Sequence, residues 1–208
     1  MNLRSRVKIC GITSPEQAAS VAQAGADAIG IVFYAPSPRS VMDVSLAAEI
    51  ANAVGPFVSV VGLFVDADRT AIESVLNRVP LSCIQFHGNE SADFCSSFHR
   101  PFIKAVRMKP GLALNDVLVT YKHAQGILLD TYVKGVPGGT GEAFNWALVP
   151  KDSQIPIILA GGLTADNVGA AITTTSPYGV DVSGGVEVSP GIKDLNKVHA
   201  FIRNAKSE

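Results

Sequence analysis

The chain has 208 residues, of which 47% are hydrophobic and 17% charged, and its formal net charge is −1. This length suits one sizeable hydrophobic core. The near-neutral charge, with lysines and arginines scattered along the chain, argues against nucleic-acid binding. The longest apolar runs, such as Ile155–Ala160, have the length of a strand and are far too short to span a membrane.

The start of the chain and its cysteines bear on where the protein works. Residues 1–6 are short, polar and basic, and they lead directly into a strand-like segment, unlike a cleaved signal peptide. The three cysteines are an odd number without metal-binding spacing. We therefore expect reduced thiols in a cytoplasmic protein. No linker or low-complexity segment interrupts the sequence, so we expect one domain over residues 1–208.

Short runs of β-branched and apolar residues recur about every 20–30 residues. Each run is continuously apolar, as a parallel strand buried on both faces requires. The eight predicted strands are Val7–Ile12, Ala28–Phe33, Val58–Val65, Ser82–His87, Phe102–Met108, Gly126–Thr131, Ile155–Gly161 and Gly179–Ser183.

Helix-like stretches separate these runs. The first has Ser14 as its N-cap and Pro15 in its first turn, and Gly25 ends it. A short sixth helix is expected around Phe144–Leu148. The other predicted helices are Ser45–Val54, Asp68–Val79, Ser91–Phe98, Leu112–Tyr121, Thr164–Ile172 and Ile192–Ala205.

Strict alternation of strand and helix implies parallel pairing with right-handed crossovers. Two folds fit this pattern, a closed barrel and an open doubly wound sheet. The count of eight strands favours the barrel. An open sheet would also carry a dinucleotide-binding fingerprint after its first strand, where this chain has Gly11-Ile12-Thr13. The predicted fold is therefore α/β, a compact (β/α)₈ or TIM barrel.

Two glycine-rich loops suggest a phosphate site. Gly161-Gly162 follows the seventh strand and Gly184-Gly185 follows the eighth. Paired glycines let backbone N–H groups approach an anion, and a helix N-terminus behind them would add partial positive charge. Such pairs can also simply make tight turns. The loops after strands seven and eight are, however, the usual phosphate site of barrel enzymes, so we predict a small phosphorylated ligand.

A third glycine-rich segment, Gly138–Gly141, follows the sixth strand. It could close over a substrate as a lid, or it could be a flexible connection without a further role.

Cys10 lies on the first predicted strand, and Asp130 lies near the end of the sixth. Cys10 could be a small buried hydrophobe or a catalytic thiol, which would need help to ionise. Asp130 could be a partly desolvated acid or the cap of the next element. Cys83 and Cys95 look structural, since one lies early in a strand and the other within a helix.

Arg39 and His87 are further candidates. Arg39 lies in Pro36-Ser37-Pro38-Arg39, where two prolines stiffen the loop, and its guanidinium suits a carboxylate or a phosphate. It could equally be a solvated surface residue. His87 could assist proton transfer or contact substrate. No histidine–carboxylate set has metal-ligand spacing. The other reactive residues near strand ends are Lys8, Asp66, Gln85, Arg107 and Asp181.

Several short motifs, each weak alone, occur together in a specific order and spacing. They are Lys8–Ile12, Ser37–Arg39, Gln85–Gly88, Leu128–Asp130, Gly138–Gly141, Leu159–Leu163 and Asp181–Glu187. With these motifs the chain resembles the phosphoribosylanthranilate isomerase family of tryptophan biosynthesis over nearly its whole length.

The resemblance implies an Amadori rearrangement of N-(5-phosphoribosyl)anthranilate, without a cofactor or metal. It implies Asp130 as the general acid that protonates the ribose ring oxygen, and Cys10 as the general base that removes the C2 proton. Arg39 would bind the anthranilate carboxylate. The substrate-binding residues expected besides Arg39 are His87, Gly141, Gly162, Gly184 and Gly185. The resemblance leaves monomer and homodimer both open.

The chain departs from the family pattern at three places. Gly184 stands where the family usually has serine, so we expect backbone amides to do more of the phosphate binding. Asn145 replaces the usual aspartate before Trp146 and can still cap a helix. Phe86 replaces a common leucine, a change of packing.

Two other functions compete with this one. Other phosphosugar barrels favour metal-binding histidine–aspartate sets, or aspartates on strands one and five, where this chain has Cys10 and Arg107. A non-catalytic scaffold barrel would have no need for both Cys10 and Asp130.

Overall fold

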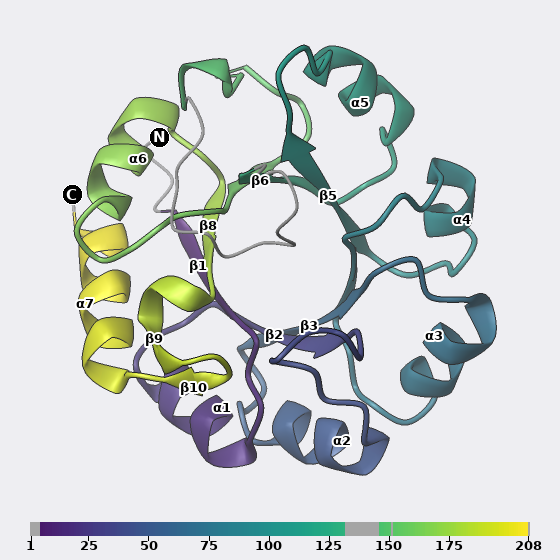
Figure 1. The fold of residues 1–208 in the computed structure, drawn as a ribbon, viewed down its shortest axis with the longest axis vertical. Helices are drawn as coiled ribbons and strands as arrows, with labels where there is room; N and C mark the ends of the chain where they lie inside the picture. Colours follow the sequence, from purple (N-terminus) through teal and green to yellow (C-terminus); the bar gives the residue numbers. More distant parts are fainter. Residues whose placement is uncertain (1–4, 132–145, 151, 208) are drawn as a thin grey trace.

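The structure is a computed structural model that describes residues 5–131, 146–150 and 152–207. Its strands form a closed parallel barrel in the order β1 to β8 (Figure 1), which confirms the predicted fold. Closure comes from β1 pairing with β8, with Lys8 opposite Asp181. The strands are β1 (Arg6–Cys10), β2 (Ala28–Phe33), β3 (Ser59–Phe64), β4 (Cys83–Phe86), β5 (Phe102–Met108), β6 (Gly126–Thr131), β7 (Ile157–Leu159) and β8 (Gly179–Val182).

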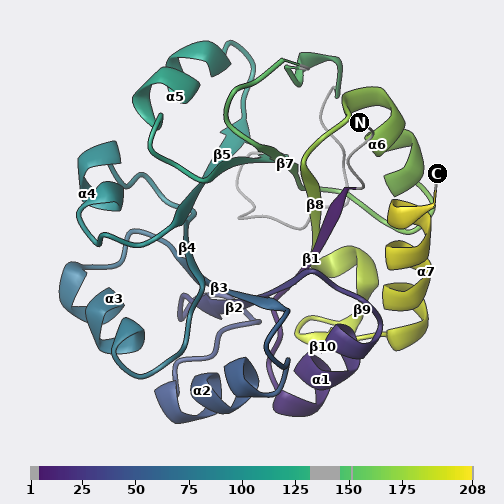
Figure 2. The ribbon, with the colours of Figure 1, turned by 180° about the vertical axis from the view of Figure 1, so that it is seen from behind.

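Helices surround the barrel, as Figures 1 and 2 show from its two ends. Side chains cap several of them, and Ser14, as predicted, accepts a hydrogen bond from the Gln17 amide at the start of α1. The helices are α1 (Pro15–Gln23), α2 (Val44–Asn52), α3 (Arg69–Leu76), α4 (Ala92–Ser96), α5 (Leu114–Thr120), α6 (Val168–Thr175) and α7 (Leu195–Lys206), with 3₁₀ turns η1 (Trp146–Leu148) and η2 (Gly184–Val186).

In the last third of the chain, β7 is shorter than the predicted strand Ile155–Gly161, and two helices begin later than predicted. Helix α6 begins at Val168 and not at Thr164, because the Asn167 side chain accepts from the Thr164 amide and donates to the Gly162 carbonyl, which holds a turn. Helix α7 begins at Leu195 and not at Ile192. Ile192–Lys193 instead forms β10, which pairs antiparallel with β9 (Glu187–Ser189).

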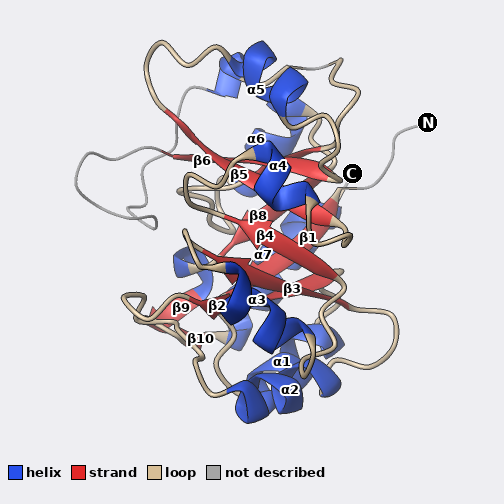
Figure 3. Cartoon of the chain, turned by 90° about the vertical axis from the view of Figure 1, so that its right-hand side faces the viewer, coloured by secondary structure: helices blue, strands red, loops and turns tan. Residues whose placement is uncertain are grey.

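The main core lies between the strands and the helices. Figure 3 shows the strands running through the middle of the molecule with the helices outside them. Aromatic side chains fill part of this layer; Phe86 on β4, for example, packs edge-on against Phe94 of α4 and Phe102 of β5. Smaller clusters from alternate strand positions, such as Cys10, Val32 and Leu63, pack separately.

Within the described residues, no helix is both long and apolar enough to cross a membrane.

Candidate active site

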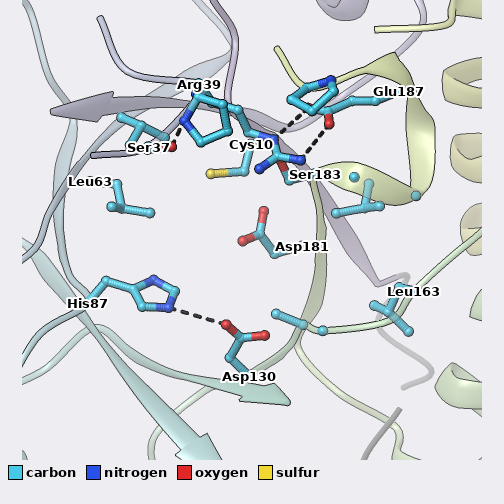
Figure 4. Close-up of a pocket in the computed structure, with 18 of the residues that line it drawn as sticks. Cys10, Ser37, Arg39, Leu63, His87, Asp130, Leu163, Asp181, Ser183 and Glu187 are labelled. Carbon is cyan, nitrogen blue, oxygen red and sulfur yellow. Dashed lines mark hydrogen bonds and ion pairs between the residues drawn. The ribbon is translucent and has the colours of Figure 1, made fainter. Parts of the chain in front are cut away.

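A cavity of about 550 Å³ opens at the carboxyl ends of the strands. Its size is typical of sites for small molecules. The cavity brings together most of the predicted site residues, since its lining includes Cys10, Arg39, His87, Asp130, Gly162, Gly184 and Gly185. Figure 4 shows the Cys10 thiol and the Asp130 carboxylate facing the cavity from opposite sides.

Cys10 is almost fully buried, with 6% of its surface exposed. Burial raises the pKa of its thiol. The ammonium groups of Lys8 and Lys193 oppose this effect, the Asp181 carboxylate adds to it, and the pKa stays above its ordinary value. In the ligand-free protein the neutral thiol is therefore favoured, and the two lysines make its ionisation less costly.

Gly30 on β2 makes room for the thiol. A Cβ atom at this position would lie 2.7 Å from Cys10 Sγ and 3.1 Å from Lys8 Cε. Both distances are shorter than ordinary van der Waals contacts. The absence of a side chain at Gly30 therefore allows Cys10 and Lys8 to occupy their observed positions.

Asp130 is linked to His87 and Gln85 by hydrogen bonds. The Gln85 amide nitrogen lies 3.0 Å from His87 Nδ1, and His87 Nε2 lies 3.3 Å from Asp130 Oδ2. The direction of both hydrogen bonds depends on the tautomer of His87. His87 thus joins Gln85 and Asp130 in one hydrogen-bonded chain. Sequence reasoning singled out all three residues but did not connect them.

Arg39 is held by a residue that sequence reasoning did not select. Its Nε and Nη2 atoms donate to the two oxygens of Glu187, at 2.8 and 2.6 Å. Lys193, whose side chain is fully buried, also donates to Glu187, at 2.7 Å. Burial alone would raise the pKa of Glu187, but hydrogen bonds from Arg39 and Lys193 outweigh it and keep that pKa below its usual value.

The two glycine loops meet at the cavity. A Cβ atom on Gly185 would overlap the carbonyl oxygen of Leu163, so the loop after β8 lies directly on the loop after β7. Gly161 and Gly162 both have positive φ, at 78° and 65°, which favours glycine. Asn167 holds the Gly162 carbonyl. Because the peptide bond is trans, the N–H of the next residue, Leu163, points in the direction opposite to the Gly162 carbonyl.

The helix predicted directly behind the first glycine pair is displaced, because α6 begins only at Val168. The second pair lies within the 3₁₀ turn η2 itself, and the next helix, α7, begins only at Leu195. A macrodipole contribution is therefore weaker than predicted, and the loop amides are left as the main anion donors.

Two predicted features lie outside the described residues: Gly141 with its loop Gly138–Gly141, and Asn145. Among the residues that are described, no group of three or more histidine, cysteine, aspartate or glutamate side chains could hold a metal ion.

Comparison with known proteins identifies the family. A model of the N-(5'phosphoribosyl)anthranilate (PRA) isomerase family matches residues 7–204. The chain belongs to this family. The N-(5'-phosphoribosyl)anthranilate isomerase of Pseudomonas aeruginosa is 57% identical over 202 residues, which cover 97% of this chain and 95% of that protein.

Solved structures agree with this assignment. The crystal structure of phosphoribosyl anthranilate isomerase from Thermotoga maritima has a TM-score of 0.90 and 38% identity, covering 98% of this chain and all of that one. A second structure, of a phosphoribosyl anthranilate isomerase in complex with reduced 1-(o-carboxyphenylamino)-1-deoxyribulose 5-phosphate, covers the same shares with a TM-score of 0.86 and 38% identity. The activity predicted from the sequence, PRA isomerisation in tryptophan biosynthesis, is confirmed by this family membership.

Proposed function

We propose that Cys10 and Asp130 act as base and acid in the conversion of N-(5-phosphoribosyl)anthranilate to 1-(2-carboxyphenylamino)-1-deoxyribulose 5-phosphate. The observation that carries this proposal is their placement. Cys10 on β1 and Asp130 on β6 line one cavity from different sides, so they can flank a bound sugar. An aldose-to-ketose rearrangement needs one acid and one base on opposite sides of the sugar.

Asp130 acts first in this scheme. Its carboxyl group protonates the ribose ring oxygen while the C1–O bond breaks, which leaves an open-chain Schiff base with positive charge on nitrogen. The hydrogen bond between His87 Nε2 and Asp130 Oδ2 orients the carboxyl group. His87 also lines the cavity and is placed to contact the substrate.

Cys10 then removes the C2 proton as the thiolate, once its own thiol proton has passed to solvent. The positive charge of the open-chain Schiff base favours the thiolate, as a nearby cation does for any acidic group. It adds to Lys8 and Lys193, which already lower the cost of ionisation. Removal of the C2 proton gives a neutral enolamine, which tautomerises to the ketone.

Arg39 binds the anthranilate carboxylate at one end of the substrate. A guanidinium has five N–H donors. In Arg39, the N–H of Nε and one N–H of Nη2 donate to Glu187. The remaining donors are available for a second carboxylate. Glu187 and Lys193 therefore orient Arg39 for binding.

The loops after β7 and β8 bind the phosphate, through amides around Gly162, Gly184 and Gly185. Binding of both the carboxylate and the phosphate fixes the reacting carbons relative to Cys10 and Asp130. We include Gly141 as a substrate contact on the strength of the sequence motif. The protein acts without a cofactor in this scheme, as one domain in a monomer or homodimer.

Complementation tests the activity in a cell. A tryptophan auxotroph that lacks this isomerase should grow without tryptophan when it expresses the chain. The Cys10→Ser variant, produced at the same level, is the matched control and should support growth poorly. Failure of well-folded wild-type protein to restore growth would contradict the proposed function.

A further inference from the structure

Asp181 is a buried carboxylate in the cavity to which the scheme above gives no role. It lies on β8, and its Oδ1 accepts a hydrogen bond from Lys8 Nζ at 2.9 Å. Both side chains are nearly inaccessible, 9% exposed for Asp181 and 7% for Lys8. A buried ion pair is weak evidence for stability alone, because desolvation offsets much of its attraction. Its position in the reaction cavity calls for a chemical explanation.

The barrel topology places Asp181 between the proposed base and the proposed acid. Going round the barrel from β1 to β6 by the shorter way, β8 and β7 lie between them. Asp181, Cys10 and Asp130 all line the same cavity, and in Figure 4 the Asp181 carboxylate points into it between the other two. Its charge also raises the pKa of Cys10, which reflects how near the two groups are.

The proton balance of the proposed reaction shows what is missing. Asp130 gives one proton to the ring oxygen, and the Cys10 thiolate takes the C2 proton. When the enolamine becomes the ketone, C1 gains a proton and the C2 hydroxyl loses one. The Cys10 thiol can return its proton to C1, and the hydroxyl proton passes to a second base, for which the cavity offers Asp181 and the Asp130 carboxylate.

We propose that Asp181 is a further catalytic residue, which accepts the C2-hydroxyl proton in the last step. This role rests on the proposed function. The O–H electron pair forms the C2=O bond as the C1=C2 electron pair takes the proton from the Cys10 thiol. Lys8 holds Oδ1 of Asp181, so Oδ2 is the oxygen assigned to the substrate. After turnover Asp181 carries one extra proton and Asp130 lacks one, and exchange with water restores both.

Deuterium exchange at C2 separates this step from the earlier ones. In ²H₂O, an enolamine that returns to substrate takes deuterium at C2, and mass spectrometry of recovered substrate measures it. Asp181→Asn keeps an oxygen that can accept from Lys8 but is a much poorer proton acceptor. We expect this variant to form product roughly 100-fold more slowly or worse. Its ratio of C2 exchange to product formation should rise at least about tenfold, because the enolamine returns to substrate more often before it goes on to product.

Two controls make the readout specific. Cys10→Ser should lose exchange and product formation together; persistent exchange in that variant would contradict the proposed base without bearing on Asp181. Glu90→Gln changes another buried carboxylate paired with a lysine, Lys104 at 2.8 Å, outside the residues that line the cavity. It should leave the exchange-to-product ratio unchanged.

Two results would overturn the role of Asp181. One is product formation by Asp181→Asn within about threefold of wild type, which would leave Asp130 or water as the acceptor. The other is an equal fall in exchange and product formation, which would place Asp181 at or before C2 proton removal. If Asp181→Asn does not fold, Lys8→Gln/Asp181→Asn replaces the ion pair with a neutral pair. The same ratio is then the readout.

Discussion

The two sides of the cavity hold their proposed catalytic groups in different ways. On the β1 and β8 side, Cys10 lies among buried charges, with Lys8 paired to Asp181 and Arg39 and Lys193 paired to Glu187. On the β4 and β6 side, Asp130 is hydrogen-bonded to His87, which Gln85 orients. A buried thiol needs nearby cations to ionise, whereas a carboxyl group that must give up a proton needs to be oriented.

Removing either catalytic group should have the largest effect. Cys10→Ser and Asp130→Asn should each lower kcat by about 10²–10⁴, the usual contribution of a general base or acid. Steady-state kinetics of the purified variants measures this. Cys83→Ser, at a cysteine outside the cavity lining, is the control and should keep kcat close to wild type. Wild-type turnover in either catalytic variant would remove that residue from the scheme.

Removing the Arg39 guanidinium, which binds the substrate carboxylate in the proposed scheme, should act mainly on KM. Arg39→Ala should raise KM by about 10- to 100-fold, because charged hydrogen bonds are worth roughly 1.5–3 kcal/mol. Glu187→Gln should raise KM less, since it loosens Arg39 without removing it. Arg78→Ala, at an exposed arginine outside the cavity lining, serves as the control and should leave KM unchanged. An unchanged KM for Arg39→Ala would exclude Arg39 from the binding site.

Crowding the thiol should have a smaller effect. Gly30→Ala would place a Cβ 2.7 Å from Cys10 Sγ and force the thiol to move. We expect kcat to fall about tenfold, since a displacement of about 1 Å in an active site can cost roughly 100-fold in rate. Gly169→Ala, where the new Cβ would meet only the Asn204 carbonyl oxygen at 3.8 Å, is the matched control. Equal kcat values for the two variants would show that the thiol position does not matter.

Adding a side chain at Gly184, where the family usually has serine, should have the smallest effect. A Cβ on Gly184 would meet Arg39 Nη2 at 3.5 Å, an ordinary contact, whereas one on Gly185 would overlap the Leu163 carbonyl oxygen. Gly184→Ser should therefore fold normally and lower KM by about two- to threefold through an added hydroxyl contact. Gly185→Ser should lower the unfolding temperature. Similar behaviour of the two variants would contradict the described loop packing.

The barrel strands could be predicted from sequence because each is a local pattern. Runs such as Ala28–Phe33 and Phe102–Met108 are apolar and β-branched over a strand's length, and the structure has the same bounds. The start of α7 could not be found this way. Ile192–Lys193 forms a strand only because Glu187–Ser189 lies beside it.

The candidate site shows the same limit. Cys10, Asp130 and Arg39 were found from short motifs at strand ends. The partner of Arg39, Glu187, lies 148 residues away in sequence, and that of Lys8, Asp181, lies 173 residues away. No local pattern connects such residues; closure of the barrel between β1 and β8 does. Sequence reasoning therefore selected the reactive groups but missed the ion pairs around them.

The most direct test of the separate roles of the two sides is the isotope effect of substrate deuterated at C2. In Cys10→Ser, removal of the C2 proton becomes the slow step, so deuteration should clearly lower kcat. In Asp130→Asn, ring opening precedes any C–H cleavage and becomes the slow step, so kcat should be the same for both isotopes. Equal isotope effects in the two variants, or the reverse order, would contradict the assignment of base to Cys10 and acid to Asp130.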